Sequence, residues 1–391
     1  MFAIDRYDLV VLGSGEAGKY LAWTLSKAGH RTALVERSMV GGSCPNVACL
    51  PSKNIIHSAK VASLARRGAE FGLELSSLAT NIAGVQDRKR RMVDALVKVH
   101  LDRYEASGAE LIMGHGRFVA SKTIGITLNT GGERVITAER IVLSVGTRTS
   151  VPTVPGLIDA SPMTHVQALD LERVPPHLVV IGGGYVGLEL AQAIRRFGSG
   201  MTVIERGPQL ASREDPDVGA ALLELFRDEG IEVLLHANVA AIEGRSGERV
   251  RVNVEDAEGA RVIEATDLLI AAGRTPNTDG IGLELAGVEV DARGNIIVNE
   301  RLETTARDVW AVGDCAGSPQ FTHAAYDDFR IVRDNLGGGH RTTHERLASI
   351  SFSPCCARGR SPNRVGSSRC SSKRRATGFL AFQHSAQKRA S

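Results

Sequence analysis

The stretch LVVLGSGEAGKYLA (9–22), closed by ALVER (33–37), decides the fold of this chain, because it returns as LVVIGGGYVGLELA (178–191), closed by TVIER (202–206). In each copy an apolar, β-rich run meets a GxGxxG turn, a helical stretch follows, and a second predicted strand ends in a glutamate. The copies lie 169 positions apart, and each glutamate follows its first glycine by 23 positions. The repeat predicts two strand–helix–strand units.

The glycines and the glutamate of each copy have distinct physical roles. The first glycine permits a tight turn, the second lets a pyrophosphate approach the backbone, and the third lets helix and strand pack closely. The helix N-terminus offers unsatisfied N–H groups to phosphates, and the glutamate accepts hydrogen bonds from a ribose hydroxyl. One such turn could be an ordinary glycine turn, but two complete copies predict two dinucleotide sites. The residues are Gly13, Gly15, Gly18 and Glu36 in the first copy, and Gly182, Gly184, Gly187 and Glu205 in the second.

Two dinucleotide sites in one chain suggest two different cofactors, since an electron carrier that stays bound must be reduced by a second carrier that binds and dissociates. A flavin and a nicotinamide are the natural pair. The runs 141–147, 268–276 and 309–314 each look like a strand that ends in a glycine turn. We therefore expect an α/β fold with two Rossmann-like domains.

Composition narrows the class of protein further. The 391 residues are 43% hydrophobic and 23% charged, which indicates a globular chain, and the 42 glycines with only 4% aromatic residues fit nucleotide-binding turns better than stacking platforms for nucleic acid. No apolar run approaches the roughly 18 residues that a membrane span needs. The N-terminus leaves no room for a signal peptide, so we expect a cytoplasmic protein that does not bind membranes. Six cysteines do not make a disulfide scaffold.

The segments GGSCPNVACLPSK (41–53), AAGRTPN (271–277) and WAVGDCAG (310–317), together with both glycine units, resemble the class I pyridine nucleotide-disulfide oxidoreductases. This family includes dihydrolipoamide dehydrogenase, glutathione reductase and mercuric reductase. The resemblance covers about residues 6–345, in the family's order and spacing. The pattern around the first cysteine and the stretch 321–346 are most similar to flavoproteins called mercuric reductase-like. An enzyme of the dihydrolipoamide dehydrogenase type is the alternative.

The resemblance also implies that the second Rossmann-like domain is inserted in the first. The implied parts are a FAD-binding domain (1–150), an NAD(P)H-binding domain (151–276), a central segment completing the FAD domain (277–347) and a tail (348–391).

The resemblance implies a role for each matching residue. Cys44 and Cys49 match the redox disulfide, with Cys49 nearest the flavin and Cys44 exchanging with the substrate. Lys53 matches a lysine near the flavin that pairs with the position of Glu189. Tyr185 matches the aromatic residue that gates the nicotinamide pocket. Other positions implied to contact the cofactors are Gly42, Ser43, Gly146, Gly273, Arg274 and Asp314, the last of which matches the acidic residue that holds the ribityl and phosphate region of FAD.

The implied mechanism is an electron relay. NADH or NADPH reduces the flavin, the flavin reduces the cysteine pair through Cys49, and Cys44 passes electrons to a small-molecule disulfide or to Hg(II), because soft thiolates suit both. NADH is preferred, because Glu205 would repel the 2′-phosphate of NADPH, although the neighbouring Arg206 keeps NADPH open. No resident metal ion is expected.

The spacing of the cysteines makes a structural demand. Positions five apart on a regular helix are separated by a rise of about 7.5 Å, which exceeds the Cα separation of a disulfide. The first helical turn must therefore be distorted, and Pro45 suits a helix start there. The helix N-terminus would favour the thiolate form of Cys49. The competing interpretations are two buried thiols or half a zinc site, but the second CxxC pair that zinc sites use is missing from the sequence.

The chain departs from the family near Leu347. Residues 348–391 hold nine Lys and Arg, ten Ser and no acidic residue, whereas the first 347 residues hold 38 basic and 44 acidic residues. In the family, about 110 residues at this point form the dimer and carry a His-Glu pair that acts as general base. We expect a reading-frame change near codon 348, an impaired enzyme and loss of the family homodimer.

Several residues invite functional interpretations that we weigh against structural ones. His323 could replace the missing base, and His57 follows the cysteines, but packed histidines are the expected outcome for both. Cys355 and Cys356 resemble the terminal cysteine pair of mercuric reductases only by adjacency, which we take as coincidence. The basic tail could bind nucleic acid or a membrane surface, as an interaction module on an inactive flavoprotein. Its three phenylalanines show no stacking rhythm, so nucleic acid is not the expected partner.

Overall fold

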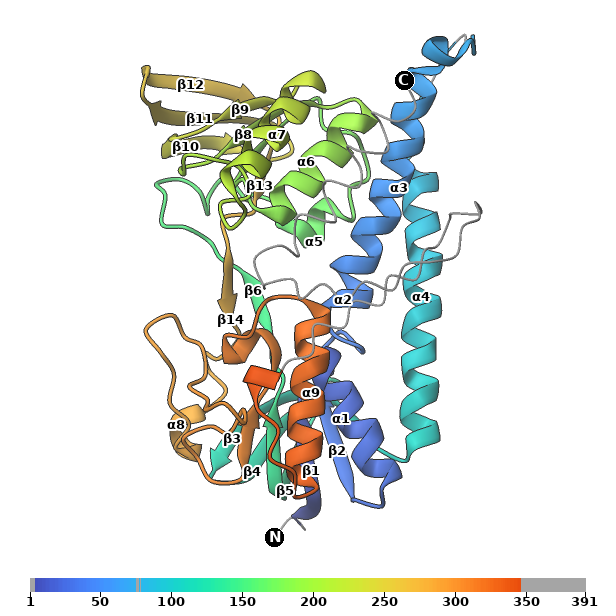
Figure 1. Cartoon of the computed structure of the whole chain (residues 1–391), viewed down its shortest axis with the longest axis vertical. Coiled ribbons are helices and arrows are strands. Elements are labelled where there is room, and N and C mark those ends of the chain that lie inside the picture. Colours follow the sequence, from blue (N-terminus) through green and yellow to red (C-terminus); the bar gives the residue numbers. More distant parts are fainter. Residues whose placement is uncertain (1–3, 75–76, 78, 346–391) are drawn as a thin grey trace, which may run out of the picture.

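The structure is a computed structural model that describes residues 4–74, 77 and 79–345. Two α/β units follow one another along the long axis of the molecule, and two long helices, α3 (Cys49–Arg66) and α4 (Ile82–Ser107), run along one side (Figure 1). The predictions made for the tail, including those for Cys355 and Cys356, lie outside the described residues.

The first unit is built on a parallel sheet in which neighbours follow the order β3, β2, β1, β5 and β15. Val10 in the centre of β1 lies opposite Ala33 on β2 and Ile141 on β5, and all three are fully buried. A run of β-branched residues without polar alternation is what a strand covered on both faces requires. The strands are β1 (Asp5–Leu12), β2 (Thr32–Glu36), β3 (Glu110–Ala120), β4 (Thr123–Leu128), β5 (Glu133–Leu143) and β15 (Val309–Ala311).

The long strands β3 and β5 also extend beyond this sheet. Their other halves pair antiparallel with β4, so a three-stranded meander continues from the parallel sheet. A buried cluster that includes Phe118 and Ile124 fills the space between the meander, the sheet and the short helix α8. The opposite face is covered by α1 and α9, with Trp23 and Phe329 in the contact. The helices are α1 (Glu16–Lys27), α8 (Leu283–Ala286) and α9 (Thr322–Leu336).

The second unit repeats this plan with residues from the middle of the chain. Its parallel sheet has the order β13, β7, β8 and β9, and an antiparallel meander of β10, β11 and β12 lies beside it. The strands are β7 (His177–Ile181), β8 (Gly200–Ile204), β9 (Glu232–Leu234), β10 (Asn238–Arg245), β11 (Arg249–Asp256), β12 (Gly259–Ala265) and β13 (Asp267–Ile270). The helices are α5 (His165–Ala168), α6 (Tyr185–Phe197) and α7 (Pro216–Asp228).

Two antiparallel strands join the units. The strand β6 (Thr147–Thr149) leaves the first unit and β14 (Arg274–Pro276) returns to it, and the two pair with each other (Figure 1). The first sheet therefore uses strands from both ends of the described chain, and the second sheet uses strands between them. The predicted α/β fold with two Rossmann-like units is correct. The three predicted runs each contain a strand that ends before its glycine, since β5 ends at Leu143, β13 at Ile270 and β15 at Ala311.

The remaining helices connect the units. α3 packs against α6 of the second unit and against α4, while α4 also contacts α1 of the first unit. These helices are α2 (Ser43–Asn46), α3 (Cys49–Arg66) and α4 (Ile82–Ser107), and single 3₁₀ turns lie at η1 (Gly68–Phe71), η2 (Gly313–Ala316) and η3 (Thr343–Glu345). Within the described residues, no helix combines the length and the apolar run that a membrane crossing would need.

Candidate active site

The predicted redox cysteines lie where two helices meet. Cys44 is in the short helix α2 and Cys49 is the first residue of α3. Between the helices Ala48 has φ −135° and ψ −109°, so the helical path is broken. The predicted distortion of the helix start is therefore correct, and it lets the two thiols share a hydrogen bond. Both side chains are half-buried, and the structure holds them as free thiols.

The turn before Cys44 packs the loop that carries this residue, called the cysteine loop here, against the first glycine unit. Gly42 has φ 77°, and a methyl group on it would lie 2.6 Å from the Cα of Gly15. Any larger residue at position 42 would push the two loops apart. Asn46 closes the turn, since its Nδ2 donates to the carbonyl oxygens of Val40 at 3.0 Å and of Gly42 at 2.7 Å. Ser43, which starts α2, thus stands directly beside the first glycine turn.

The two thiols have different electrostatic surroundings. The hydrogen bond with Cys44 and the nearby charge of Lys53 lower the pKa of Cys49 to about 7, against the opposing effect of burial. The same hydrogen bond, together with burial, raises the pKa of Cys44. Cys49 is therefore the first thiol of the reduced pair to ionise. A thiolate at the start of α3 is further favoured by the partial positive charge of a helix N-terminus.

Lys53 and Glu189 form the ion pair that the resemblance implies. Lys53 Nζ lies 2.5 Å and 2.7 Å from the two carboxylate oxygens of Glu189. Lys53 belongs to α3 and Glu189 to α6, so the pair joins α3 to the second unit one helical turn beyond Cys49.

The first glycine unit forms a tight cradle. A methyl group on Gly18 would collide with the carbonyl oxygen of Gly13, so α1 packs as closely on β1 as the third glycine predicts. In the described part of the chain, no side chain caps the N-terminus of α1 at Gly15. The first N–H groups of the helix are thus left for another acceptor, which suits a pyrophosphate.

Glu36 is held inside this first cradle. Its Oε2 accepts hydrogen bonds from Ser14 N at 2.9 Å and Ser14 Oγ at 2.7 Å, and its Oε1 accepts from the backbone N–H groups of Ser38 at 2.9 Å and Met39 at 3.0 Å. The side chain is 7% exposed. Ser14 was not among the predicted residues, although its place inside the GxGxxG turn could have suggested a contact with the glutamate.

The second glycine unit has the same backbone but is more open. A methyl group on Gly187 would collide with the carbonyl oxygen of Gly182, whereas the methyl position of Gly184 has no described atom within 4 Å. Glu205 accepts hydrogen bonds from Gly183 N and Gly207 N, both at 2.7 Å. The predicted residues are again brought together, and this cradle also fits a dinucleotide, because its second glycine leaves the backbone accessible.

Asp314 lies at the junction between the units. Thr147 Oγ1 donates to Asp314 Oδ2 at 2.7 Å, and Arg274 donates to Thr147 Oγ1 at 2.7 Å and to its carbonyl oxygen at 2.8 Å. Burial lowers the pKa of Arg274. The Arg274 Nε lies 4.0 Å from Asp314, so Thr147 mediates the closer contact between them. Gly146 and Gly273 take positive φ values, 65° and 128°, on either side of the β6–β14 pair. Thr147 is a residue that sequence reasoning missed.

Tyr185 begins α6 beside the second cradle. Its hydroxyl donates to Glu214, and burial together with this contact raises the pKa of Tyr185 to about 12. Its ring lies 6.3 Å from that of Phe321, which in turn stacks on His323 at 5.3 Å. Neither Phe321 nor Glu214 was predicted, and Glu214 carries no local signal in the sequence.

The two histidines weighed in the sequence lie on the surface. His323 is exposed but packs on Phe321, and His57 is exposed on α3. Among the described residues, there is no group of three or more His, Cys, Asp or Glu side chains that could hold a metal ion.

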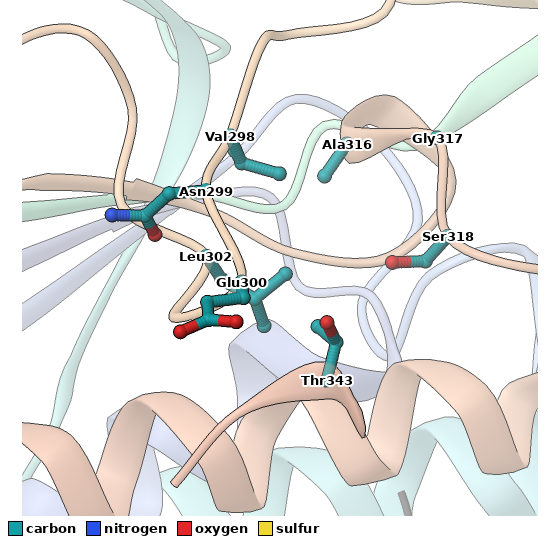
Figure 2. A pocket seen from close by; sticks show the side chains of 8 residues that line it. All are labelled: Val298, Asn299, Glu300, Leu302, Ala316, Gly317, Ser318 and Thr343. Carbon is teal, nitrogen blue, oxygen red and sulfur yellow. The ribbon is translucent and has the colours of Figure 1, made fainter. Parts of the chain in front are cut away.

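A hollow of about 300 Å³ lies beside η2, the 3₁₀ turn that contains Asp314 (Figure 2). It is lined by Val298, Asn299, Glu300, Leu302, Ala316, Gly317, Ser318 and Thr343. The predicted site residues are not part of this lining, and Glu300 is its one titratable side chain among the described residues. The lining therefore shares no residue with the cysteine pair or with either glycine cradle.

The chain matches a known family over most of its length. The family described as "Pyridine nucleotide-disulphide oxidoreductase" matches residues 7–328. RclA of Escherichia coli (strain K12), named "Probable pyridine nucleotide-disulfide oxidoreductase", is 36% identical over 349 residues, which are 88% of this chain and 74% of that protein. The mercuric reductase of Bacillus cereus is 34% identical over 349 residues, again 88% of this chain. The chain spans only 54% of the length of that reductase.

A solved structure has the same fold. The HOCl-induced flavoprotein disulfide reductase RclA from Escherichia coli, in a Cu(II) complex, superposes with a TM-score of 0.78 and 34% identity. The match covers 87% of this chain and 73% of that one. The same protein described without copper gives a TM-score of 0.76 and 35% identity.

Proposed function

The chain belongs to the pyridine nucleotide-disulphide oxidoreductase family, a family of flavin-dependent enzymes that use a pyridine nucleotide, and on this premise we propose that Cys44 and Cys49 are its redox pair. The observation that carries the proposal is the break at Ala48 between Cys44 and Cys49, next to the packing of Gly42 on Gly15 of the first cradle and the ion pair of Lys53 with Glu189 on the helix of the second cradle. The hydrogen bond from Cys44 lowers the pKa of Cys49 to about 7. One thiol of the reduced pair is thus prepared to be a thiolate near neutral pH.

The two cradles support a division of labour between cofactors. FAD would be held by Gly13, Gly15, Gly18, Glu36, Gly42, Ser43, Gly146 and Asp314, and the nicotinamide dinucleotide by Gly182, Gly184, Tyr185, Gly187, Glu205 and Gly273, with Lys53 and Arg274 near the flavin side. When bound, these cofactors would supply the hydride and electron transfer that returns the oxidised cysteine pair to two thiols.

The cysteines would then act on a substrate disulfide by thiol–disulfide exchange. Cys44 Sγ attacks one substrate sulfur, so the substrate disulfide breaks and a mixed disulfide forms, while the first leaving thiolate takes a proton from water. Cys49 Sγ next attacks Cys44 Sγ, which releases the second substrate thiol and leaves the Cys44–Cys49 disulfide. Lys53 stabilises the charge of Cys49 as a thiolate, and Glu189 holds the lysine in place.

For the electron acceptor we favour Hg(II), with a small-molecule disulfide as the second candidate. The support is the resemblance to mercuric reductases and the affinity of thiolates for soft ions. For the donor we favour NADH, because Glu205 would repel a 2′-phosphate, while the exposed Arg206 is the group that could attract one. We keep the cytoplasm as the proposed location, since a thiol pair of this kind works in a reducing compartment.

An anaerobic titration of the purified full-length chain with NADH tests this proposal. We expect a flavin absorbance that bleaches, followed by a long-wavelength band as the Cys49 thiolate faces oxidised flavin. The steady-state rates with NADH and NADPH, each with Hg(II) and with a dithiol-derived disulfide as acceptor, then rank donor and acceptor. A protein that carries no flavin, or a flavin that NADH and NADPH both fail to bleach, would contradict the proposal and favour an inactive flavoprotein relative.

A further inference from the structure

An aromatic contact that the proposed function leaves unexplained joins the two units. The ring centroids of Tyr185, the first residue of α6, and Phe321 are 6.3 Å apart. Phe321 directly precedes α9, which begins on the side of the first unit that faces the second (Figure 1). Because Tyr185 directly follows Gly184 of the second cradle, its ring reaches from this cradle to the unit that contains the proposed flavin site.

The side of α6 that carries Tyr185 faces the helix of the cysteines. Tyr185 and Glu189 are four residues apart, so their side chains lie on the same side of the helix. Glu189 accepts two hydrogen bonds from Lys53 of α3, at 2.5 Å and 2.7 Å. The tyrosine ring therefore lies where the second cradle, α3 and the first unit meet. A nicotinamide that is bound through the second cradle has to cross this junction to reach a flavin in the first unit.

The hydroxyl end of Tyr185 is held by the segment that follows β8. The hydroxyl donates a hydrogen bond to Glu214 Oε1. A hydrogen bond from a hydroxyl to a carboxylate is roughly twice as strong as one between neutral groups. Both side chains are half-buried, so water competes with this bond only in part. The ring is thus fixed at both ends, by α6 at its Cβ and by Glu214 at its oxygen.

The segment that carries Glu214 is fastened to the second glycine turn. Ala211 N donates to the carbonyl oxygen of Gly183 at 2.8 Å, and Glu214 N donates to the carbonyl oxygen of Ala211 at 2.8 Å. Ala211 is buried and has a φ of 48°, a conformation that an alanine keeps only where the surrounding contacts enforce it. Gln209 Nε2 donates to the carbonyl oxygen of Glu214 at 3.0 Å. The backbone that positions the Glu214 carboxylate therefore has a fixed place beside the cradle.

We propose that Glu214 is a positioning residue that latches the Tyr185 ring against Phe321 and so keeps the passage from the second cradle to the flavin site closed until a nicotinamide enters. The proposal rests on the proposed function in assigning the nicotinamide dinucleotide to the second cradle. To the gating role that the resemblance implies for Tyr185, it adds the group that holds the gate. A site that must open before its ligand enters binds that ligand less tightly, in proportion to the fraction of molecules that are open.

Calorimetric titration with two ligands that cannot reduce a flavin tests the latch on the full-length chain. NAD⁺ carries the nicotinamide, whereas ADP-ribose lacks it and does not need the passage. Tyr185→Phe keeps the ring but removes the hydroxyl donor, so we expect it to bind NAD⁺ about three- to tenfold more tightly. Glu214→Gln should act in the same direction but more weakly, because an amide oxygen accepts a weaker hydrogen bond than a carboxylate. The affinity for ADP-ribose should stay unchanged in both variants.

The comparison of the two ligands separates a latch from a structural role. If the bond only holds the segment 207–214 in place, its loss should disturb the second glycine turn and weaken the binding of NAD⁺ and ADP-ribose alike. That result, or an NAD⁺ affinity that neither variant raises, would overturn the proposal. Glu224→Gln, at an exposed position on α7, is the matched control and should bind both ligands as the unmodified chain does.

A double variant shows whether the two residues act through one bond. Tyr185→Phe combined with Glu214→Gln should gain no more NAD⁺ affinity than Tyr185→Phe alone, and additive gains would contradict the latch. If circular dichroism shows that Tyr185→Phe does not fold, Glu214→Gln decides, and an NAD⁺ affinity that it fails to raise is the overturning result. An unmodified chain that binds neither ligand would contradict the proposed nicotinamide site and the latch with it. Variants that match an unmodified chain binding both ligands would overturn the latch alone.

Discussion

The two glycine cradles share a backbone plan but differ in how firmly they are closed. Glu36 in the first cradle accepts four hydrogen bonds and is 7% exposed, whereas Glu205 in the second accepts two and is more open to solvent. The surroundings of the second glycine of each motif, Gly15 and Gly184, differ in the same way. Gly42 of the cysteine loop packs on Gly15, while the methyl position of Gly184 has no described atom within 4 Å.

This difference shows how one motif can serve two kinds of ligand. A cradle closed by a neighbouring loop and by buried hydrogen bonds suits a cofactor that stays bound. An open cradle at the start of a helix suits one that must enter and leave in every turnover. The distinction lies in what packs against the motif, since the spacing of glycines and glutamate is identical in the two copies.

The largest expected effect comes from a side chain that blocks the phosphate position in the first cradle. Gly15→Val would place a branched side chain against Ser144 Oγ, which lies 3.3 Å from the methyl position of Gly15, and in the path of a pyrophosphate. We expect the purified variant to lose its flavin, with a flavin-to-protein ratio at least about tenfold lower, a loss of more than about 1.4 kcal/mol in binding free energy. The ratio of visible to ultraviolet absorbance measures this loss. A variant with the normal flavin content would refute the assignment of the first cradle.

The matched change in the second cradle should leave the flavin in place. Gly184→Val has room for its side chain, so the protein should fold and remain yellow, but the backbone can no longer approach a pyrophosphate. We expect KM for NADH to rise by about 10- to 100-fold, as for the loss of 1.4 to 3 kcal/mol of binding energy. Stopped-flow reduction of the flavin measures it. Loss of flavin in this variant would show that the two cradles are not functionally separate.

The sequence predicted this comparison only in part. The repeat predicted both cradles. The spacing of Cys44 and Cys49 correctly predicted a broken helix, because a regular helix would hold the two residues too far apart. The closure of the first cradle depends on the packing of Gly42 on Gly15, residues far apart in the sequence whose approach no local pattern encodes.

The partners of the predicted residues were the harder part. Thr147 bridges Arg274 and Asp314, and Glu214 holds Tyr185, but each contact joins segments that meet only in the folded chain. Lys19 directly follows the first glycine motif, yet on an isolated helix it would be one more surface lysine. Its burial depends on α4, which places His100 against it.

A smaller effect should separate the two glutamates. In the flavin-free protein, Glu36→Gln replaces one acceptor oxygen with an NH₂ group that faces N–H donors, so we expect a loss of about 3 kcal/mol in the free energy of unfolding. Glu205→Gln, with half as many bonds and more solvent, should lose about 1 to 2 kcal/mol. Urea denaturation of both variants measures the difference. Equal losses would contradict the view that the first cradle is the more tightly closed.

The smallest expected effect concerns the link between the units. Burial lowers the pKa of His165 to about 4, with a further contribution from Arg274, and the ring shares a 3.1 Å hydrogen bond with Thr149 on β6. The unfolded histidine, with a pKa near 6.5, binds a proton below that pH while the folded one does not, so stability is unaffected above pH 6.5 and falls as pH decreases towards 4.

Between pH 7 and 5.5 this group should contribute a loss of about 1 kcal/mol. His165→Asn cannot take up the proton, so the variant should lose that much less stability over the same interval, as measured by urea denaturation at both pH values. His57→Asn, at an exposed site on α3, is the matched control and should behave like the unmodified chain. If His165→Asn keeps the full pH dependence, the acid sensitivity belongs to one of the units rather than to the link, and the comparison between the cradles would have to include it.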